Sequence, residues 1–135
     1  MAISIKTLAT GRLKIKHDTA LLPGERLLYA APHPSEPFHA TGKKSALVTA
    51  MRFFHSGQPG QAALTMNLYF VRYDSQGSLG QRDQRFILPL NLNLNSGELK
   101  VDSTPLVLEE GDAILGDASV SNTIQYVISG VEQEV

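Results

Sequence analysis

The sequence predicts an all-β protein: a single-domain β-sandwich or jelly roll of about eight to ten antiparallel strands. Three observations predict this class. Apolar and polar residues alternate with a period of two over most of the chain, helical periodicity is nearly absent, and turn-forming residues recur roughly every 8–15 positions. The chain has 135 residues, of which 42% are hydrophobic, so we expect residues 1–135 to form one domain around one core.

The first half of the chain predicts short strands followed by two long ones. The Ile3/Ile5 pair and residues 14–16 suggest half-exposed strands, and residues 25–29 follow a Pro-Gly turn signal. A loop with three prolines over residues 32–42 cannot lie inside a sheet. The strongest strands are residues 45–55 and 62–73, with a turn between them. On the second of these, Leu64, Met66, Leu68 and Phe70 are expected to face the core, and Thr65, Asn67, Tyr69 and Val71 a partly wet or partnered side.

The second half predicts shorter strands that are separated by turns. Residues 85–95 alternate leucine with asparagine, and Pro89 places this segment at a sheet edge or a bulge. Further strands are expected at residues 98–102, 105–108, 113–115 and 123–131. Strands in such close succession favour a sandwich over a βαβ fold.

The stretch from Leu108 to Ile114 is interpreted as a structural turn. Gly111 suits a position with positive φ, and the Asp112 side chain can accept hydrogen bonds from the backbone of the turn. Leu108 and Ile114 then point into the core. The alternative is a metal site, for which Glu109, Glu110, Asp112 and Asp117 supply oxygen ligands, but the ligand spacing of a calcium loop is missing.

No other motif predicts catalysis, a metal site or a cofactor, and we expect a protein that is not an enzyme. Cysteine is absent, and no Gly-x-Ser-x-Gly elbow or phosphate-binding glycine loop occurs. The four histidines have no metal-pair spacing with one another: His17, His33, His39 and His55. The aromatic residues on predicted strands are expected in the core, with a ligand-stacking platform as the alternative: Phe53, Phe54, Tyr69, Phe70, Tyr73 and Tyr126.

Charge is segregated along the chain. Residues 1–55 carry a net charge of +5 and residues 56–135 a net charge of −6. Because the N-terminal lysines are interleaved with apolar residues, we expect them to meet acidic strands, within a subunit or between copies, and we do not expect nucleic-acid binding. The N-terminus lacks the apolar region of a signal peptide, and no stretch is long enough to span a membrane.

Short motifs distributed over the chain resemble a set of small jelly-roll virion proteins of tailed bacteriophages. Residues 11–13 (GRL), residues 27–32 (LLYAAP) and residues 63–73 (ALTMNLYFVRY) are similar to their first and central strands. The C-terminal third is similar to their ending, a Leu-x-x-Gly-Asp-x-Ile turn followed by small residues and a strand closing in Ile-Ser-Gly-x-Glu. Its positions here are Leu108, Gly111, Asp112, Ile114, Ala118, Ser119, Asn122, Ile128, Ser129, Gly130 and Glu132.

The resemblance implies a capsid decoration (cement) protein: a non-enzymatic protein that forms a homodimer or homotrimer and stabilises the phage head by bridging major capsid subunits. It implies a place on the capsid surface of a virion that is assembled in the host cytoplasm. The alternative is a tail- or fibre-associated module that binds a receptor or glycan.

We expect residues 1–17 to form an N-terminal arm that can leave the body and contact other subunits. Deleting residues 2–16 is expected to abolish capsid binding and leave the sandwich folded. The expected contact residues of the arm are Ile3, Ile5, Lys6, Leu13, Lys14, Ile15 and Lys16.

Overall fold

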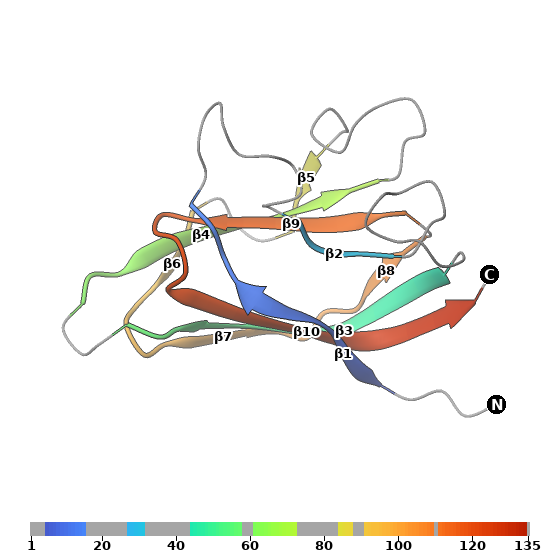
Figure 1. Cartoon of the computed structure of the whole chain (residues 1–135), viewed down its shortest axis with the longest axis horizontal. Coiled ribbons are helices and arrows are strands. Elements are labelled where there is room, and N and C mark those ends of the chain that lie inside the picture. The colour runs from blue at the N-terminus through green and yellow to red at the C-terminus, as the bar shows by residue number, and fades with distance from the viewer. Residues whose placement is uncertain are drawn as a thin grey trace.

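A computed structural model shows a β-sandwich of ten strands in two antiparallel sheets of five strands each (Figure 1). The structure describes residues 5–15, 27–31, 44–57, 61–72, 84–87, 91–109 and 111–134. Every secondary-structure element in these ranges is a strand, which confirms the predicted all-β class. Within the same ranges, no helix has the length and apolar character needed to cross a membrane.

Each sheet has two long strands at its centre and shorter ones at its edges. The first sheet has the order β1 (Lys6–Arg12), β10 (Ile124–Glu134), β3 (Lys44–His55) and β7 (Leu99–Asp102), and β8 (Leu106–Leu108) also pairs with β3. The second sheet has the order β2 (Leu27–Ala30), β9 (Ala113–Ala118), β4 (Leu64–Val71) and β5 (Gln84–Phe86), and β6 (Leu92–Leu94) also pairs with β4.

The strand pairs are nested along the chain. β1 pairs with β10, β2 with β9, β3 with both β7 and β8, and β4 with both β5 and β6. The chain therefore doubles back on itself like one long hairpin. Its successive strand pairs, from the outermost inwards, belong alternately to the first and the second sheet. In the outermost pair, Lys6 lies opposite Gly130. Contacts of such long sequence separation make folding slow, because the entropy of closing large loops is lost before the contacts form.

The long strands agree with the sequence prediction, and the short ones differ from it in part. β3 and β4 cover most of residues 45–55 and 62–73, and β10 extends the predicted 123–131 strand to Glu134. Residues 85–95 form two short strands, β5 and β6, in place of one. Residues 14–16 were expected in a strand, but Ile15 makes only an isolated bridge with Ala118.

The main core lies between the two sheets, and a second cluster of buried residues lies on the other face of the second sheet: Ala30, Tyr69, Val71, Ala113 and Leu115. Phe53 and Ile128 from the first sheet and Leu68 and Ile114 from the second are fully buried. Leu64, Met66 and Leu68 of the expected core face of β4 are buried and Phe70 is half-buried, but Asn67, Tyr69 and Val71 on its other side are buried as well. Of the predicted partly wet or partnered second face, the wet part is therefore wrong for these three residues, because period-two alternation shows which residues share a side and not what covers it.

The described part of the expected N-terminal arm lies in the body of the sandwich. β1 is hydrogen-bonded to β10, and Leu13 is fully buried where Gly116 leaves room for it: a Cβ atom at Gly116 would lie 3.2 Å from a Leu13 methyl carbon. Deletion of residues 2–16 would remove a strand and a core leucine. We therefore expect this deletion to destabilise the sandwich, in place of leaving it folded as the sequence suggested.

A β-bulge in the β3–β10 pair creates a position that only glycine fits. The register shifts between Ser129 and Gly130, and a Cβ atom at Gly130 would overlap the carbonyl oxygen of Leu47 on the neighbouring strand. Because that oxygen belongs to the backbone of a central strand, it cannot move aside as a side chain could. The glycine of the C-terminal motif is thus a packing requirement of the sheet.

We expect Gly130→Ala to destabilise the fold by about 1–3 kcal/mol or more, because the added methyl group forces two central strands apart. The matched control is Gly11→Ala, where the new Cβ atom meets the Tyr126 hydroxyl at 2.8 Å and the side chain of Tyr126 can rotate away. Urea unfolding of both variants measures the difference. Equal losses of stability would contradict the role assigned to the bulge.

Candidate protein-binding surface

The outer side of the first sheet carries exposed apolar side chains on adjacent strands. The exposed fractions are 38% for Leu47, 39% for Phe54, 53% for Leu99, 45% for Val101 and 65% for Val107. We call these five residues the apolar face. Single exposed apolar residues are common on protein surfaces, whereas a contiguous group of them marks an interaction site more often.

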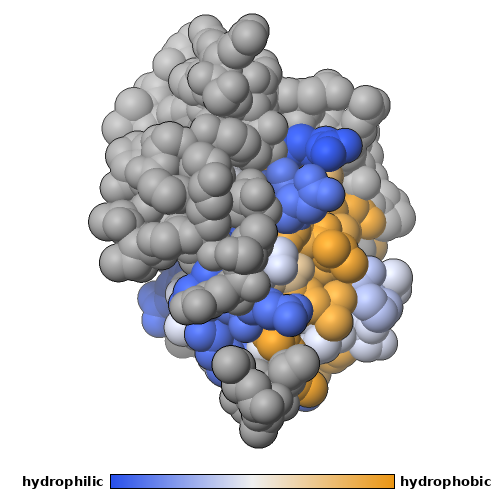
Figure 2. All heavy atoms as spheres, turned by 90° about the vertical axis from the view of Figure 1, so that its right-hand side faces the viewer, coloured by the Kyte–Doolittle hydropathy of each residue, from blue (hydrophilic) through white to orange (hydrophobic). Residues whose placement is uncertain are grey.

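Strand register places the five residues in two groups on the same side of the sheet. Phe54 lies opposite Leu99 in the β3–β7 pair, and Leu47 lies opposite Val107 in the β3–β8 pair. Their chain neighbours Phe53 and Leu108 are buried, so the exposed set points away from the core. Figure 2 views the end of the sandwich where β3 begins and β10 ends, and on that end it shows a strip of hydrophobic residues with hydrophilic ones beside it.

β10 adds two half-buried valines next to the apolar face. Val131 lies opposite Leu47, and Val127 lies opposite Arg52. The outward-facing side chains between these two rows are small, because Ser129 lies opposite Ala50. The surface therefore consists of two apolar groups with a row of small side chains between them.

Charge on this side of the sheet is entirely positive. At the paired, outward-facing positions of β1, β3, β7, β8 and β10, the charged residues are Arg12 and Arg52, and none is Asp or Glu. Neither arginine makes a hydrogen bond or ion pair in the described part of the chain. Both guanidinium groups are thus available to carboxylates of a partner.

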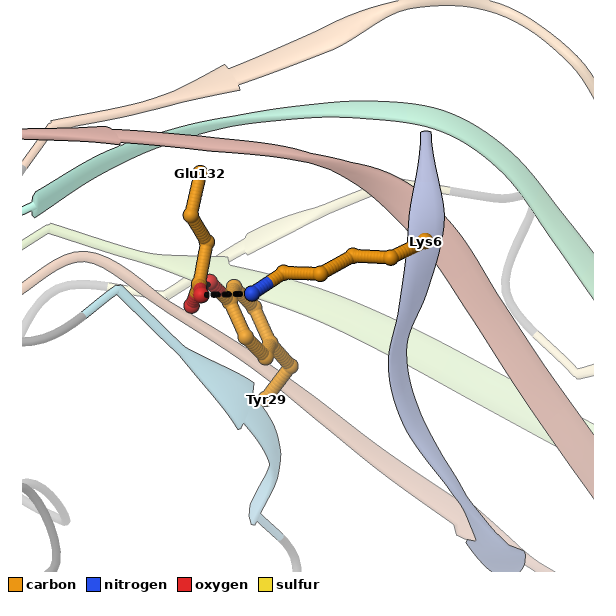
Figure 3. A network of polar contacts seen from close by, with 3 residues as sticks. All are labelled: Lys6, Tyr29 and Glu132. Carbon is orange, nitrogen blue, oxygen red and sulfur yellow. Dashed lines mark hydrogen bonds and ion pairs between the residues drawn. The ribbon is translucent and has the colours of Figure 1, made fainter. Parts of the chain in front are cut away.

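A network of three polar side chains ties the two sheets together at one edge (Figure 3). Lys6 Nζ on β1 lies 2.8 Å from Glu132 Oε1 on β10, and the Tyr29 hydroxyl on β2 donates to Glu132 Oε2 at 2.5 Å. The Tyr29 ring is buried. Glu132 therefore receives one donor from its own sheet and one from the opposite sheet.

The network shifts the pKa values of its members in opposite directions. Burial by itself would raise the pKa of Glu132, but the hydrogen bonds from Lys6 and Tyr29 and the charges of Lys6 and Lys44 outweigh it, and the pKa lies below its usual value. Burial raises the pKa of Tyr29 far above its ordinary value, and the hydrogen bond to Glu132 and its charge add to this effect. Around neutral pH the network thus consists of a charged pair and a neutral tyrosine.

The expected contact residues of the N-terminal arm are in different environments. Ile5 is 67% exposed, Lys14 donates from Nζ to Asn122 Oδ1 at 2.5 Å, and Ile15 is half-buried. Leu13 is in the core and Lys6 is in the Glu132 network, so neither presents a free side chain to a partner in this fold. Ile3 and Lys16 lie outside the described residues.

The bend around Gly111 has the geometry of a structural turn. Gly111 has a φ of 86°, and Asp112 Oδ2 accepts a hydrogen bond from the Glu109 amide at 3.0 Å. Gly111 also donates its amide to the Ala31 carbonyl oxygen at 2.9 Å, and the Ala31 amide donates to Asp112 in return. Leu108 and Ile114 are fully buried on either side. The bend therefore holds β8 and β9 against the end of β2.

The carboxylates considered for a metal site serve separate structures. Asp117 is buried beside β4, where its Oδ1 accepts from Asn67 Nδ2 at 3.2 Å, and Asn67 Oδ1 accepts from the Asn91 amide at 2.7 Å. Glu110 lies outside the described residues. Across the described ranges, no three His, Asp or Glu side chains come together to hold a metal ion.

His55 lies in the core at the end of β3 and joins two backbone segments. Its Nδ1 accepts from the Gly57 amide at 3.0 Å, and its Nε2 lies 3.1 Å from the Ala62 carbonyl oxygen, which fits a neutral ring that donates from Nε2. His17, His33 and His39 are outside the described part of the chain. Among the described members of the aromatic set, Phe53, Tyr69 and Tyr126 are buried, and Phe54 is the one on the apolar face.

No protein-family model, curated protein or solved structure matches this chain.

The C-terminal motif, from Leu108 to Glu132, maps onto positions that hold the fold. Gly111 and Asn122 have positive φ angles, and the Ser119 hydroxyl accepts from the Thr65 amide. Glu132 is the centre of the network between the sheets, and Gly130 is the bulge. The buried apolar members are Leu108, Ile114, Ala118 and Ile128. The motif therefore encodes a sandwich and contains none of the apolar face.

We expect Glu132→Gln to be less stable than the wild type by about 1–3 kcal/mol near neutral pH, because hydrogen bonds to a charged acceptor are lost. The lowered pKa means that the native state favours the charged carboxylate. The stabilisation is therefore complete above the ordinary glutamate pKa of about 4.3 and is lost as the pH falls through the native value. Urea unfolding between pH 3 and pH 7 measures this dependence.

A tyrosine pair provides the control for this network. Tyr29→Phe removes the donor to Glu132 and should destabilise the protein, whereas Tyr126→Phe removes a hydroxyl for which the described residues show no hydrogen bond. If both changes cost the same, or if Glu132→Gln keeps a constant deficit at every pH, the network does not link the sheets as described.

We expect Asp112→Ala to lower stability by about 1–2 kcal/mol, because the Glu109 amide loses its acceptor. Asp112→Asn should retain most of the stability, because an amide oxygen can replace the carboxylate oxygen as acceptor.

Addition of EDTA should leave the melting temperature unchanged. A melting temperature that falls with EDTA and recovers with calcium would instead indicate the metal site.

Proposed function

We propose that this chain is a structural protein of a tailed-bacteriophage virion, a capsid decoration (cement) protein that stabilises the head by bridging neighbouring major capsid subunits. The observation that carries the proposal is the apolar face, a set of exposed Leu, Val and Phe side chains on paired strands. The resemblance of residues 11–13, 27–32, 63–73 and 108–132 to such virion proteins supports it.

Stabilisation would follow from burial of the apolar face against the shell. Each Å² of apolar surface removed from water contributes roughly 25 cal/mol. A protein that binds the assembled, expanded shell and not its dissociated subunits shifts the equilibrium towards the shell by mass action. No chemical reaction is needed, and the role is non-enzymatic.

The jelly-roll topology is part of this proposal. If β5 with β6 and β7 with β8 are each counted as one interrupted strand, the chain has eight strands whose pairing is nested from the outermost pair inwards. A hairpin wrapped in this way gives the two packed sheets of a jelly roll.

To bridge the shell, one molecule or oligomer of the protein must contact more than one capsid subunit. A homodimer or homotrimer would meet this requirement. The exposed Ile5 at the start of the edge strand β1 is available for such contacts. Ile3 and Lys16, which the structure does not describe, stay part of the proposed N-terminal contact.

We expect the purified protein to co-sediment with empty, expanded shells assembled from the major capsid protein, and to raise the temperature at which those shells dissociate. Native mass spectrometry of the free protein should give a dimer or trimer. Protein that stays in the supernatant at micromolar concentration would contradict the proposal.

The tail- or fibre-associated binding module is tested in parallel. Phe54, with Gln125 and then Arg12 beside it in the register, offers one aromatic surface and polar groups for a sugar. Binding to host-cell glycans, together with failure to bind shells, would favour this second function.

A further inference from the structure

We infer that the apolar face binds a surface of the major capsid protein that has apolar side chains at its centre and carboxylates opposite Arg12 and Arg52, and that it is not a contact between two copies of this chain. The inference deepens the proposed function and rests on it. It assigns the binding surface to the outer side of the first sheet, which the sequence did not suggest.

The distribution of apolar groups sets the shape of the partner. Phe54, Leu99 and Val101 form one apolar group at the β3–β7 pair, and Leu47 and Val107 form the other at the β3–β8 pair. Ser129 and Ala50 lie between them at half-buried positions. A complementary partner surface would therefore carry two apolar patches with a polar patch between them.

The charges decide against a two-fold contact between this surface and the same surface of a second copy. A symmetric contact between two copies would bring the same surface to both sides, and therefore four arginines and no carboxylate from the paired positions of the sheet. Covering guanidinium groups without an opposite charge is unfavourable, because each loses its water without gaining a partner. A partner with carboxylates removes this penalty.

The register also sets the spacing of those carboxylates. Arg12 is on β1 and Arg52 on β3, with β10 between them, and Arg12 lies opposite Gln125 while Arg52 lies opposite Val127. The two arginines are two strands apart across the sheet and two residues apart along the strand direction. This offset corresponds to about 12 Å between their Cα atoms. Two acidic groups at about this distance would engage both arginines.

The same composition favours a protein over a nucleic acid. Phosphate backbones are bound by many cations in a row, whereas the paired, outward-facing positions of this surface carry two cations, Arg12 and Arg52, beside five exposed apolar side chains. Aliphatic side chains such as Val107 and Leu99 gain contacts from an apolar protein surface and none from a phosphate backbone.

Co-sedimentation of the full-length protein with empty, expanded shells tests the inference. We expect Arg52→Glu and Val107→Asp each to weaken binding by about tenfold or more, through charge repulsion and through the burial of an unpaired charge. Wild-type binding should weaken with rising sodium chloride concentration. The matched controls are Arg72→Glu and Val120→Asp, exposed residues that lie outside the first sheet, and both should bind within about twofold of the wild type.

Each outcome separates the inference from the proposed function. If the wild type does not sediment with shells, the proposed function fails and the inference fails with it. If the wild type sediments and the face variants sediment equally well, the inference fails alone. If the face variants convert an oligomeric free protein into monomers, the surface is a contact between copies and the inference is overturned. Binding only to DNA-filled heads would also overturn it.

Folding is checked by thermal melting of every variant. Where Arg52→Glu or Val107→Asp melts well below the wild type, Arg12→Glu or Val101→Asp takes its place, because both substitute exposed residues on the same side of the sheet.

Discussion

The pairing of β10 with β3 is the constraint on which the rest of the structure depends. It runs from Ile124 opposite His55 to Glu134 opposite Lys44, and β1, β7 and β8 are hydrogen-bonded to one or other of these two strands. Because successive residues of a strand point to opposite sides, the register that places Phe53 in the core also places Phe54 on the outside. The core and the apolar face are thus the two sides of one pair of strands, so a change of register would alter both.

Charge segregation along the chain acquires a structural meaning in this fold. The sequence left open whether basic N-terminal strands meet acidic ones within a subunit or between copies. Lys6 with Glu132 is an ion pair within the chain that joins the basic segment to the acidic one, whereas Arg72 with Glu109 joins two residues of the acidic segment. The first also recruits Tyr29 from the opposite sheet, so it fixes how the sheets meet at that edge. Arg12 and Arg52 are basic residues of the N-terminal segment for which the described residues provide no such partner.

The sequence predicted features that depend on local geometry and missed those that depend on distant partners. Long alternation was enough for β3, β4 and β10, and the Gly111–Asp112 bend follows from conformational preferences within a few residues. The limits of β1 could not be predicted, because its pairing partner is more than a hundred positions away along the chain. The apolar face was missed for a related reason: Leu106, Val107 and Leu108 form a continuous apolar run, and only the register with β3 shows that Val107 points outwards.

The position of β10 also bears on how the protein emerges from the ribosome. The last of the ten strands is not at an edge but between β1 and β3 (Figure 1). A nascent chain that has been translated only to the turn at residue 122 lacks the strand that joins β1 to the rest of its sheet, and it leaves one edge of β3 without a partner. The first sheet can therefore close only after residues 124–134 have been synthesised, and until then chaperones are expected to cover the open edge of β3.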